Sequence, residues 1–472
     1  MIEVAAMAIS CSLGNSVDSV LESLQKILTK QSESMQIKCS SDHASSDDSM
    51  SANNHDTQDN NDDKSVDWLT WSDEILVGGK SSYFGKIKGS LPQIPDSLKH
   101  YKSRNNQVLL QCAMQIETQV RDLIQAHGAH RVGLILGTTT SGLEESDKLF
   151  TAKSEGKQYE DFLFSVQEPD NGAQFLSDYF GIKGPAYTIS TACSSSARAI
   201  ISAKRLIECG AIDAAIVGGA DTLCRMPVNG FDSLDSLSYQ VCRPFAVDRN
   251  GINIGEAGAL MLLKSASEHD TKIGHGTKTS SSYNKLESCQ SNHNDLKCIS
   301  SGSKEKACDS TDSVIVIAGV GESSDSHHIS APHPEGVGAI ECMLSALKDA
   351  KLEAKDIAYI NVHGTATPLN DKVESLAINH VFGQNTPCSS IKYLLGHTLG
   401  AAGICEAVIC ALMLKYDLHI PMQNCTKEEL DEANSPCGIV TDKVLSLKTR
   451  NIMSNSFAFG GNNVSLIFSE RL

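Results

Sequence analysis

The stretch AYTISTACSSSARAIISAKRLIECGAIDAAIVGGA, residues 186–220, places a cysteine between an apolar run and a helical pattern. The run Ala186–Thr191 is short and apolar, as expected of a buried strand. Apolar side chains then recur at helical spacing, namely at Ile200, Ala203 and Ile207. Gly210 stands where such a helix would end, and a second buried strand follows at Ala214–Ala220. The stretch therefore predicts a strand–helix–strand unit with Cys193 at the start of its helix.

The same alternation of strand and helix patterns extends outward on both sides. Strand-like runs occur at Val132–Gly137, Ala257–Leu263, Val314–Val320, Ile357–Val362, Asn451–Phe457 and Asn463–Phe468. Helical patterns occur around Ala339–Ala350 and Gly403–Tyr416. Runs of this kind are buried on both faces, which favours sheets covered by helices. Because the theme occurs once before residue 266 and again after residue 313, the sequence hints at a duplicated α/β unit.

Two stretches interrupt this pattern, residues 31–66 and 266–313. The first is rich in Ser, Asp and Asn, and the second is rich in Ser with mixed charges and no periodicity. Such segments bury too little apolar surface to offset the entropy of ordering, so we predict two disordered surface insertions. A specific docking loop is the alternative for each. The predicted organisation is an N-terminal half over residues 1–265, the insertion at 266–313, and a C-terminal half over 314–472.

The composition is that of a soluble globular protein with a sizeable core, with 40% hydrophobic and 21% charged residues in 472. A net charge of -17 argues against a nucleic-acid binder, which usually presents a basic surface. The 16 cysteines follow no disulfide framework and are expected to be free thiols. The N-terminus lacks a basic signal-peptide region, and no apolar run approaches the ~20 residues of a membrane span. We therefore expect a cytoplasmic protein without a membrane span.

Cys193 is the first candidate for chemistry. At a helix N-terminus the macrodipole and the free N–H groups of the first turn favour a thiolate, which is the nucleophilic form of cysteine. The small neighbours of Cys193 leave room for a substrate carbonyl. Taken alone, a buried cysteine at a strand–helix joint explains the segment equally well.

The second segment is NVHGTATPLND, residues 361–371. His363 follows a predicted strand on a glycine-containing loop, where it could reach a cleft. Thr365 and Thr367 lie at alternate positions and would face the same way on an extended loop. A turn with a satisfied histidine is the alternative for this segment.

The third segment is SIKYLLGHTLGAAG, residues 390–403. Lys392 is expected on a short strand, and His397 lies on the glycine-rich run that opens a helix. Glycines at these positions permit close approach of the backbone. The spacing fits neither of the common phosphate-binding loops, and tight helix packing with a surface lysine is the alternative.

The fourth segment is NSFAFGGNN, residues 455–463. Gly460 and Gly461 follow Phe459 between two predicted strands, so a plain hairpin turn explains them. The functional interpretation is a backbone N–H directed at an oxyanion. Each segment is ambiguous alone, but the four in this order favour one reaction class.

In these four segments the chain resembles the β-ketoacyl-acyl-carrier-protein synthases, in their elongating form with a Cys-His-His site. Further stretches carry the same resemblance, namely VGGAD at 217–221, CRPFAVDRNGINIGEAGALMLL at 242–263 and SSDSHHISAPHPEG at 323–336. Residues 224–263 also resemble the branch associated with aryl polyene pigment assembly. The resemblance implies a thiolase-like α/β fold, with two similar halves stacked in five layers, αβαβα.

The resemblance also implies a role for each residue. Cys193 would accept the acyl chain, and His363 and His397 would hydrogen-bond the malonyl thioester carbonyl during decarboxylation. Lys392 would hold the charge state of the histidine pair. The remaining roles are a structural carboxylate beside Lys392 (Glu374), an oxyanion hole (N–H of Cys193 and Phe459), a gate (Phe459), a glycine wall (Gly460 and Gly461) and contacts to the phosphopantetheine arm (Thr365 and Thr367).

The implied reaction joins acyl and malonyl groups carried on acyl carrier protein, in fatty acid or polyene chain elongation, without a metal or a cofactor. The implied assembly is a homodimer, with Val132–Gly142 and the Cys193 region near the interface. A heterodimer with a ketosynthase-like partner stays open, and so does the alternative of a non-catalytic subunit, such as a chain-length factor. The intact Cys193 and both histidines argue against that alternative.

Overall fold

The computed structural model describes residues 1–42, 68–159, 162–266 and 313–471. Within these ranges the strands form a sheet of 11 strands and a short hairpin. The order across the large sheet is β11-β10-β9-β12-β13-β8-β1-β7-β6-β4-β5. In chain order the strands are β1 (Ile2–Ser10), β2 (Thr70–Ser72), β3 (Ser82–Phe84), β4 (Val132–Gly137), β5 (Ala186–Ile189), β6 (Ala214–Asp221), β7 (Ala257–Ser265), β8 (Val314–Ser324), β9 (Tyr359–Asn361), β10 (Pro387–Ser389), β11 (Gly438–Ile439), β12 (Asn451–Ala458) and β13 (Asn462–Arg471).

The large sheet consists of two halves with the same topology. The first half runs β1-β7-β6-β4-β5 and the second runs β8-β13-β12-β9-β10, with β11 added at its edge. In each half the first two pairings are antiparallel and the next two are parallel. The halves meet where β1 pairs with β8, Ile2 opposite Ile317 and Glu3 opposite Val316. This shared strand order is the duplicated α/β unit that the sequence pattern predicts.

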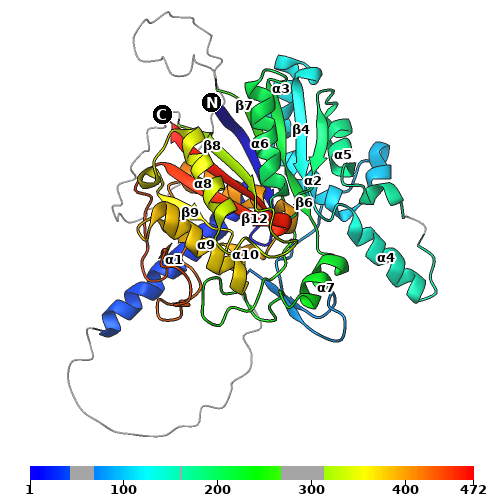
Figure 1. Cartoon of the computed structure of the whole chain (residues 1–472). Coiled ribbons are helices and arrows are strands. Elements are labelled where there is room, and N and C mark those ends of the chain that lie inside the picture. The colour runs from blue at the N-terminus through cyan, green and yellow to red at the C-terminus, as the bar shows by residue number, and fades with distance from the viewer. Residues whose placement is uncertain (43–67, 160–161, 267–312, 472) are drawn as a thin grey trace, which may run out of the picture.

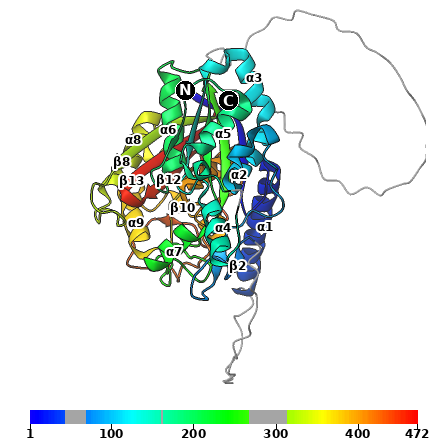
Figure 2. The same ribbon diagram turned by 90° about the vertical axis from the view of Figure 1, so that its right-hand side faces the viewer.

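Helices cover both faces of each half. In chain order they are α1 (Val17–Asp42), α2 (Arg104–Gln115), α3 (Glu117–His127), α4 (Leu143–Ser154), α5 (Asn171–Phe180), α6 (Ser195–Glu208), α7 (Arg225–Ser233), α8 (Val337–Ala350), α9 (Pro368–Phe382), α10 (Lys392–Leu395) and α11 (Ala402–Lys415). Figure 1 shows α8 and α9 over one half and α2 and α5 beside the other. Figure 2 shows α1 running along the side of the molecule. No helix of the described ranges is both long enough and apolar enough to cross a bilayer.

Alternate strand residues belong to different cores, which defines the layers. In β4, Ile135 joins the core that contains α6 and α11, whereas Leu134 joins the core under α2 and α5. In β13, Leu466 faces the shared core and Ile467 faces the core under α8 and α9. The layers are therefore helices, sheet, central helices, sheet and helices. This is the predicted five-layered arrangement, with α6 and α11 at its centre.

Two predictions about local structure are wrong. Residues 31–42 continue helix α1, so the predicted disordered insertion does not begin at residue 31. Gln31 explains part of this difference, because its side chain exchanges hydrogen bonds with the backbone of Met422, far away in sequence. Residues 43–67 and 267–312 lie outside the described residues. Lys392 begins the short helix α10 rather than lying on a strand, and the hydroxyl of Ser390 accepts from its N–H.

Candidate active site

Cys193 lies in a tight turn between β5 and α6. Ala192 has a φ of 52°, a backbone conformation that residues other than glycine rarely adopt. The hydroxyl of Ser195 ties the turn together, since it donates to the carbonyl of Ala192 and accepts from the N–H of Thr191. Helix α6 begins at Ser195, so the cysteine precedes the first turn of the helix as predicted. The side chain of Cys193 is buried.

The backbone around Cys193 favours negative charge on the sulfur, but burial outweighs it. Burial raises the pKa of the Cys193 thiol to about 12, against the charge of Lys392 and the N–H groups of Phe459 and Cys193. The predicted stabilisation of a thiolate by backbone N–H groups is present, and the burial that opposes it was not visible in the sequence. The same two N–H groups were predicted to form the oxyanion hole, and both face the sulfur.

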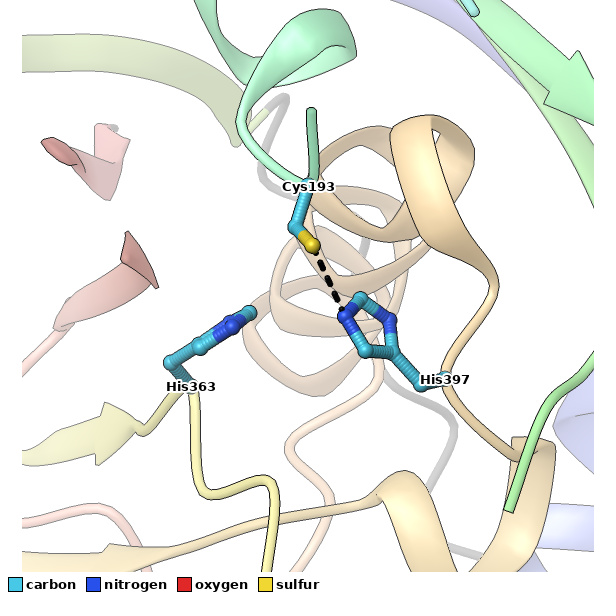
Figure 3. Close-up of side chains that lie close together, drawn as sticks. All are labelled: Cys193, His363 and His397. Atoms are coloured by element: carbon cyan, nitrogen blue, oxygen red, sulfur yellow. Dashed lines mark hydrogen bonds between the residues drawn. The ribbon is translucent and has the colours of Figure 1, made fainter. Parts of the chain in front are cut away.

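His397 contacts the sulfur directly. Its Nε2 lies 3.0 Å from Sγ of Cys193, and its Nδ1 accepts a hydrogen bond from the N–H of Leu399 at 3.2 Å (Figure 3). Burial, reinforced by the charge of Lys392, lowers the pKa of His397 well below its usual value, so the ring is neutral. A neutral imidazole carries one proton, and Nδ1 is an acceptor here. The proton therefore lies on Nε2, which makes His397 a donor toward Cys193.

His363 faces the same space from the C-terminal end of β9 (Figure 3). Its ring centroid lies 5.4 Å from that of His397, with the ring planes at 85°. Burial lowers the pKa of His363 well below its usual value, and the charge of Lys392 adds to the effect. Among the described residues, Nδ1 of His363 is buried without a hydrogen-bond partner. Two neutral imidazoles and a thiol thus converge on one space.

Glu374 orients the loop that carries His363. Its two carboxylate oxygens accept from the N–H of His363 and of Gly364, both at 2.7 Å. Burial raises the pKa of Glu374 to about 7, although these two bonds favour the charged form. The charge of Lys392 also lowers the pKa of this carboxylate, in keeping with the predicted structural carboxylate near Lys392, while its shortest hydrogen bonds are to the backbone of the loop.

The carboxylate that contacts Lys392 belongs to Glu406. The Nζ–Oε1 distance is 2.5 Å, and both side chains are almost fully buried. The charge of Lys392 lowers the pKa of both histidines, as the predicted role requires. The sequence contained a signal for this pair that was not used. Glu406 is the one acidic residue in the apolar helix AGICEAVICALMLK, and a buried acid usually has a partner.

A cavity of about 300 Å³ opens in front of Cys193, His363 and His397. It is lined by Cys193, Phe231, Leu234, Ser236, Ile252, Asp325, Ser330, Ala331, Pro332, His363, Thr365, Thr367, Pro368, Leu369, Asn370, His397, Phe457, Ala458, Phe459 and Asn463. The hydroxyls of Thr365 and Thr367 face the same way, as predicted, with their oxygens 2.9 Å apart. Phe459 packs against Phe231, with ring centroids 5.6 Å apart and the ring planes tilted by 44°, at the wall where a gate was predicted.

The glycine segment forms the hairpin turn that was one of its two predicted interpretations. Gly460 and Gly461 have φ of 78° and 72° and link β12 to β13 as a hairpin. Glycine is needed at both positions because L side chains rarely adopt such φ values. The same turn places the N–H of Phe459 beside the sulfur of Cys193.

The donor atoms of Cys193, His363 and His397 all lie within 4.8 Å of one another, a spacing that a metal ion could span. The hydrogen-bond pattern opposes this use. A metal on Nε2 of His397 requires the proton on Nδ1, but Nδ1 faces the Leu399 N–H, which is itself a donor. The cation of Lys392 adds repulsion. The arrangement is suited to donating hydrogen bonds to a developing oxyanion.

Two family models match the chain. Residues 90–269 match the N-terminal domain of beta-ketoacyl synthase, and residues 314–426 match its C-terminal domain. The 3-oxoacyl-[acyl-carrier-protein] synthase 2 of Staphylococcus aureus is 30% identical over 359 residues, which is 74% of this chain and 77% of that protein. Nodulation protein E of Rhizobium meliloti is 31% identical over 349 residues, 72% of this chain and 76% of that protein.

Solved structures agree with these relatives. A chain in the complex of the ketosynthase ApeO with its chain length factor ApeC, from Xenorhabdus doucetiae, superposes with a TM-score of 0.80 and 41% identity. The match covers 100% of this chain and 98% of that chain. A beta-ketoacyl synthase from Burkholderia phymatum matches at a TM-score of 0.70 and 24% identity, covering 100% of this chain and 99% of that one, and supports the fold alone. The predicted thiolase-like ketosynthase fold is thereby confirmed.

Proposed function

Since this chain belongs to the β-ketoacyl synthase family of condensing enzymes, we propose that it elongates an acyl chain through an acyl-Cys193 thioester. The substrates are an acyl group and a malonyl group, each carried on acyl carrier protein. The products are the 3-oxoacyl thioester, CO2 and free carrier. The observation that carries the proposal is the 3.0 Å contact between Sγ of Cys193 and Nε2 of His397, with His363 opposite.

The first half-reaction transfers the acyl group to Cys193. The sulfur attacks the thioester carbonyl, a new S–C bond forms, and the bond to the carrier sulfur breaks. The thiol proton leaves with the carrier thiol. The oxyanion of the tetrahedral intermediate accepts hydrogen bonds from the N–H groups of Cys193 and Phe459, which lie beside the sulfur.

The second half-reaction breaks the bond between the malonyl carbon and its carboxylate. CO2 leaves, and the electron pair forms an enolate whose oxygen accepts from His397 Nε2 and from His363. On the precedent of oxyanion holes, each well-aimed donor contributes about 3–4 kcal/mol. The enolate carbon then attacks the acyl-Cys193 carbonyl, the new C–C bond forms, and the cysteine leaves as a thiolate that takes up one proton from water.

We further propose that no resident cofactor is needed, because the phosphopantetheine arm arrives with the carrier. Thr365 and Thr367 would contact that arm, since their hydroxyls line the cavity in front of Cys193. The relatives named as acyl-carrier-protein synthases support the carrier as a partner. The resemblance of residues 224–263 supports polyene rather than fatty acid elongation. The free cysteines of the described residues are in keeping with a reducing cytoplasm.

The second candidate function is an accessory subunit in a heterodimer. The likeness to a chain of a ketosynthase and chain length factor complex keeps this candidate in view. The intact set of Cys193, His363, His397 and Lys392 favours the catalytic subunit, so we propose that a chain length factor, if present, is the partner.

Mass spectrometry of the intact protein and its peptides tests the proposal. We expect incubation with acyl carriers of several chain lengths to add an acyl group to Cys193, and malonyl carrier then to release a 3-oxoacyl product. Cys193→Ala should lose both. The matched control is Cys209→Ala, which removes an exposed thiol at the far end of the same helix and should keep both. A folded wild-type protein that is never acylated on Cys193 would overturn the proposal.

A further inference from the structure

Asp221, the last residue of β6, is a fully buried carboxylate that joins two separate loops. Its Oδ1 accepts from the hydroxyl of Thr138 at 2.5 Å and from the hydroxyl of Thr140 at 2.8 Å. Its Oδ2 accepts from the hydroxyl of Thr139 at 2.8 Å. From the opposite side, the N–H of Gly400 donates to Oδ2 at 2.6 Å. A carboxylate suits this position because both of its oxygens accept several bonds.

Gly400 belongs to the turn that holds the ring of His397. Leu399 has a φ of 53°, so successive N–H groups point to different acceptors. The Leu399 N–H bonds to Nδ1 of His397, and the Gly400 N–H bonds to Asp221. A Cβ added to Gly400 would lie 2.8 Å from Oδ2 of Asp221 and 3.0 Å from the carbonyl carbon of Thr138. The carboxylate is thus packed directly against this strained turn.

We propose that Asp221 is a positioning residue that fixes which nitrogen of His397 carries the ring proton. Asp221 holds the turn in which the Leu399 N–H faces Nδ1, and this leaves the proton on Nε2. The inference rests on the proposed function, in which Nε2–H donates to the enolate oxygen. Without the carboxylate, Leu399 relaxes, Nδ1 gains the proton in part of the molecules, and Nε2 presents a lone pair to the oxygen.

The bonds to Thr138, Thr139 and Thr140 could serve stability alone, whereas the bond to Gly400 reaches the catalytic histidine. The chain offers a matched pair of variants for this distinction. Asp221→Asn removes the charge and one acceptor at nearly constant shape. Thr139→Val removes one hydrogen bond to the same Oδ2 atom and leaves the Gly400 bond in place.

The experiment measures the tautomer and the two half-reactions separately. ¹⁵N NMR of histidine-labelled protein reports which ring nitrogen is protonated, with His397 assigned through His397→Gln. In Asp221→Asn we expect part of His397 to be protonated on Nδ1 and condensation to fall about 100-fold, as for a misplaced catalytic group. Acylation of Cys193 should fall far less. Thr139→Val should keep the wild-type tautomer and condense within about threefold of the wild-type rate.

A wild-type ¹⁵N pattern in folded Asp221→Asn would overturn the inference, and so would equal losses in both half-reactions. If Asp221→Asn does not fold, Gly400→Ala takes its place, because its Cβ displaces the same carboxylate; an unchanged tautomer there overturns the inference too. Failure of the proposed function has a different signature. In that case wild-type Cys193 is not acylated, while the NMR comparison still decides the role of Asp221.

Discussion

The buried pair of Lys392 and Glu406 places a full positive charge near both catalytic histidines. We expect Glu406→Gln to destabilise the fold by about 3–5 kcal/mol, because it leaves the ammonium of Lys392 buried without an ion partner. Replacing both residues, as Lys392→Met with Glu406→Leu, should restore much of that stability but not condensation. Urea unfolding of the wild type, Glu406→Gln and the double variant checks this.

The matched control for that prediction is the exposed pair of Lys355 and Glu353, whose charged atoms are also close, at 2.6 Å. Replacing Lys355 by Gln, which breaks this pair and keeps the capping carboxylate of Glu353, should leave the urea midpoint unchanged, because water screens exposed charges. If the double variant Lys392→Met with Glu406→Leu were as unstable as Glu406→Gln, the unpaired ammonium of Lys392 would not be the cause of the instability.

The ionisation of Cys193 gives a second prediction at this scale. Burial raises the pKa of this thiol to about 12, above the ordinary value of a cysteine. The thiolate fraction then grows about tenfold for each pH unit across the neutral range. We expect alkylation of Cys193 by iodoacetamide to rise log-linearly from pH 6 to pH 9, measured on its peptide by mass spectrometry. A plateau below pH 8 would show a stabilised thiolate instead.

Residue types and spacing marked Cys193, His363, Lys392 and His397 as candidates, and the order of their four segments, each ambiguous alone, favoured one site. The partner of Lys392 was not predicted, because Glu406 lies 14 positions away on another helix and only packing brings the two together. The burial that raises the pKa of Cys193 was not predicted, for a similar reason. The helix start is visible in sequence, whereas the depth of burial depends on the whole fold.

At the scale of elements, the site depends on how closely α6 and α11 cross near their N-termini. A Cβ on Gly403 would lie 2.6 Å from Cβ of Ala197 and 2.8 Å from its backbone N. We expect Gly403→Ala to cost about 1–3 kcal/mol through overpacking and to slow condensation, because the two helices carry Cys193 and His397 at their starts. Thermal unfolding and the condensation assay measure both effects.

Gly230 in α7 is the matched helical glycine, since an added Cβ meets nothing within 4 Å. Gly230→Ala should stabilise by about 0.5–1 kcal/mol through helix propensity. If Gly403→Ala and Gly230→Ala changed the free energy of unfolding by the same amount and in the same direction, the crossing of α6 and α11 would not be tight.

Element prediction succeeded where apolar runs were clear, as for β4, whose predicted and observed bounds are both Val132–Gly137. It failed for the extension of α1, where Gln31 is held by Met422 and by the hydroxyl of Tyr393. Local composition near residue 31 is polar and contains no sign of those contacts. It also failed at Lys392, where a single Ser390 side-chain bond begins a turn of helix directly after β10.

At the scale of the whole molecule, the duplicated topology explains why the catalytic groups meet. Cys193 and His397 lie in corresponding places. In chain order, each follows the third strand that its half contributes to the sheet and precedes a central helix: Cys193 lies between β5 and α6, and His397 lies between β10 and α11. His363 follows β9, the second strand of its half, and the Thr138–Thr140 loop follows β4, the second strand of the other. Asp221 and Phe459 likewise lie at the C-terminal ends of β6 and β12. These are the fourth strands of the two halves in chain order when the extra edge strand β11 is left out. Equivalent strand ends of the two halves thus supply the two sides of one site.

The same topology leaves β5 at one edge of the large sheet. The homodimer that the sequence resemblance implies can be tested at this edge. Leu134 N–H donates to the carbonyl of Pro185, and Thr138 N–H donates to that of Ile189. Because neighbouring residues of a strand face opposite sides, the N–H of Thr188 points away from β4. An exposed strand edge of this kind is a template for pairing with a second chain.

We therefore expect the purified chain to have the mass of a dimer in light scattering and Thr188→Pro to have that of a monomer. Proline removes the outward N–H without touching the bonds to β4. Thr188→Val, which keeps the N–H, should remain dimeric. A monomeric wild-type chain would contradict the homodimer, and a partner such as a chain length factor would then be needed to cover this edge. A dimer that survives Thr188→Pro would place the interface elsewhere on the molecule.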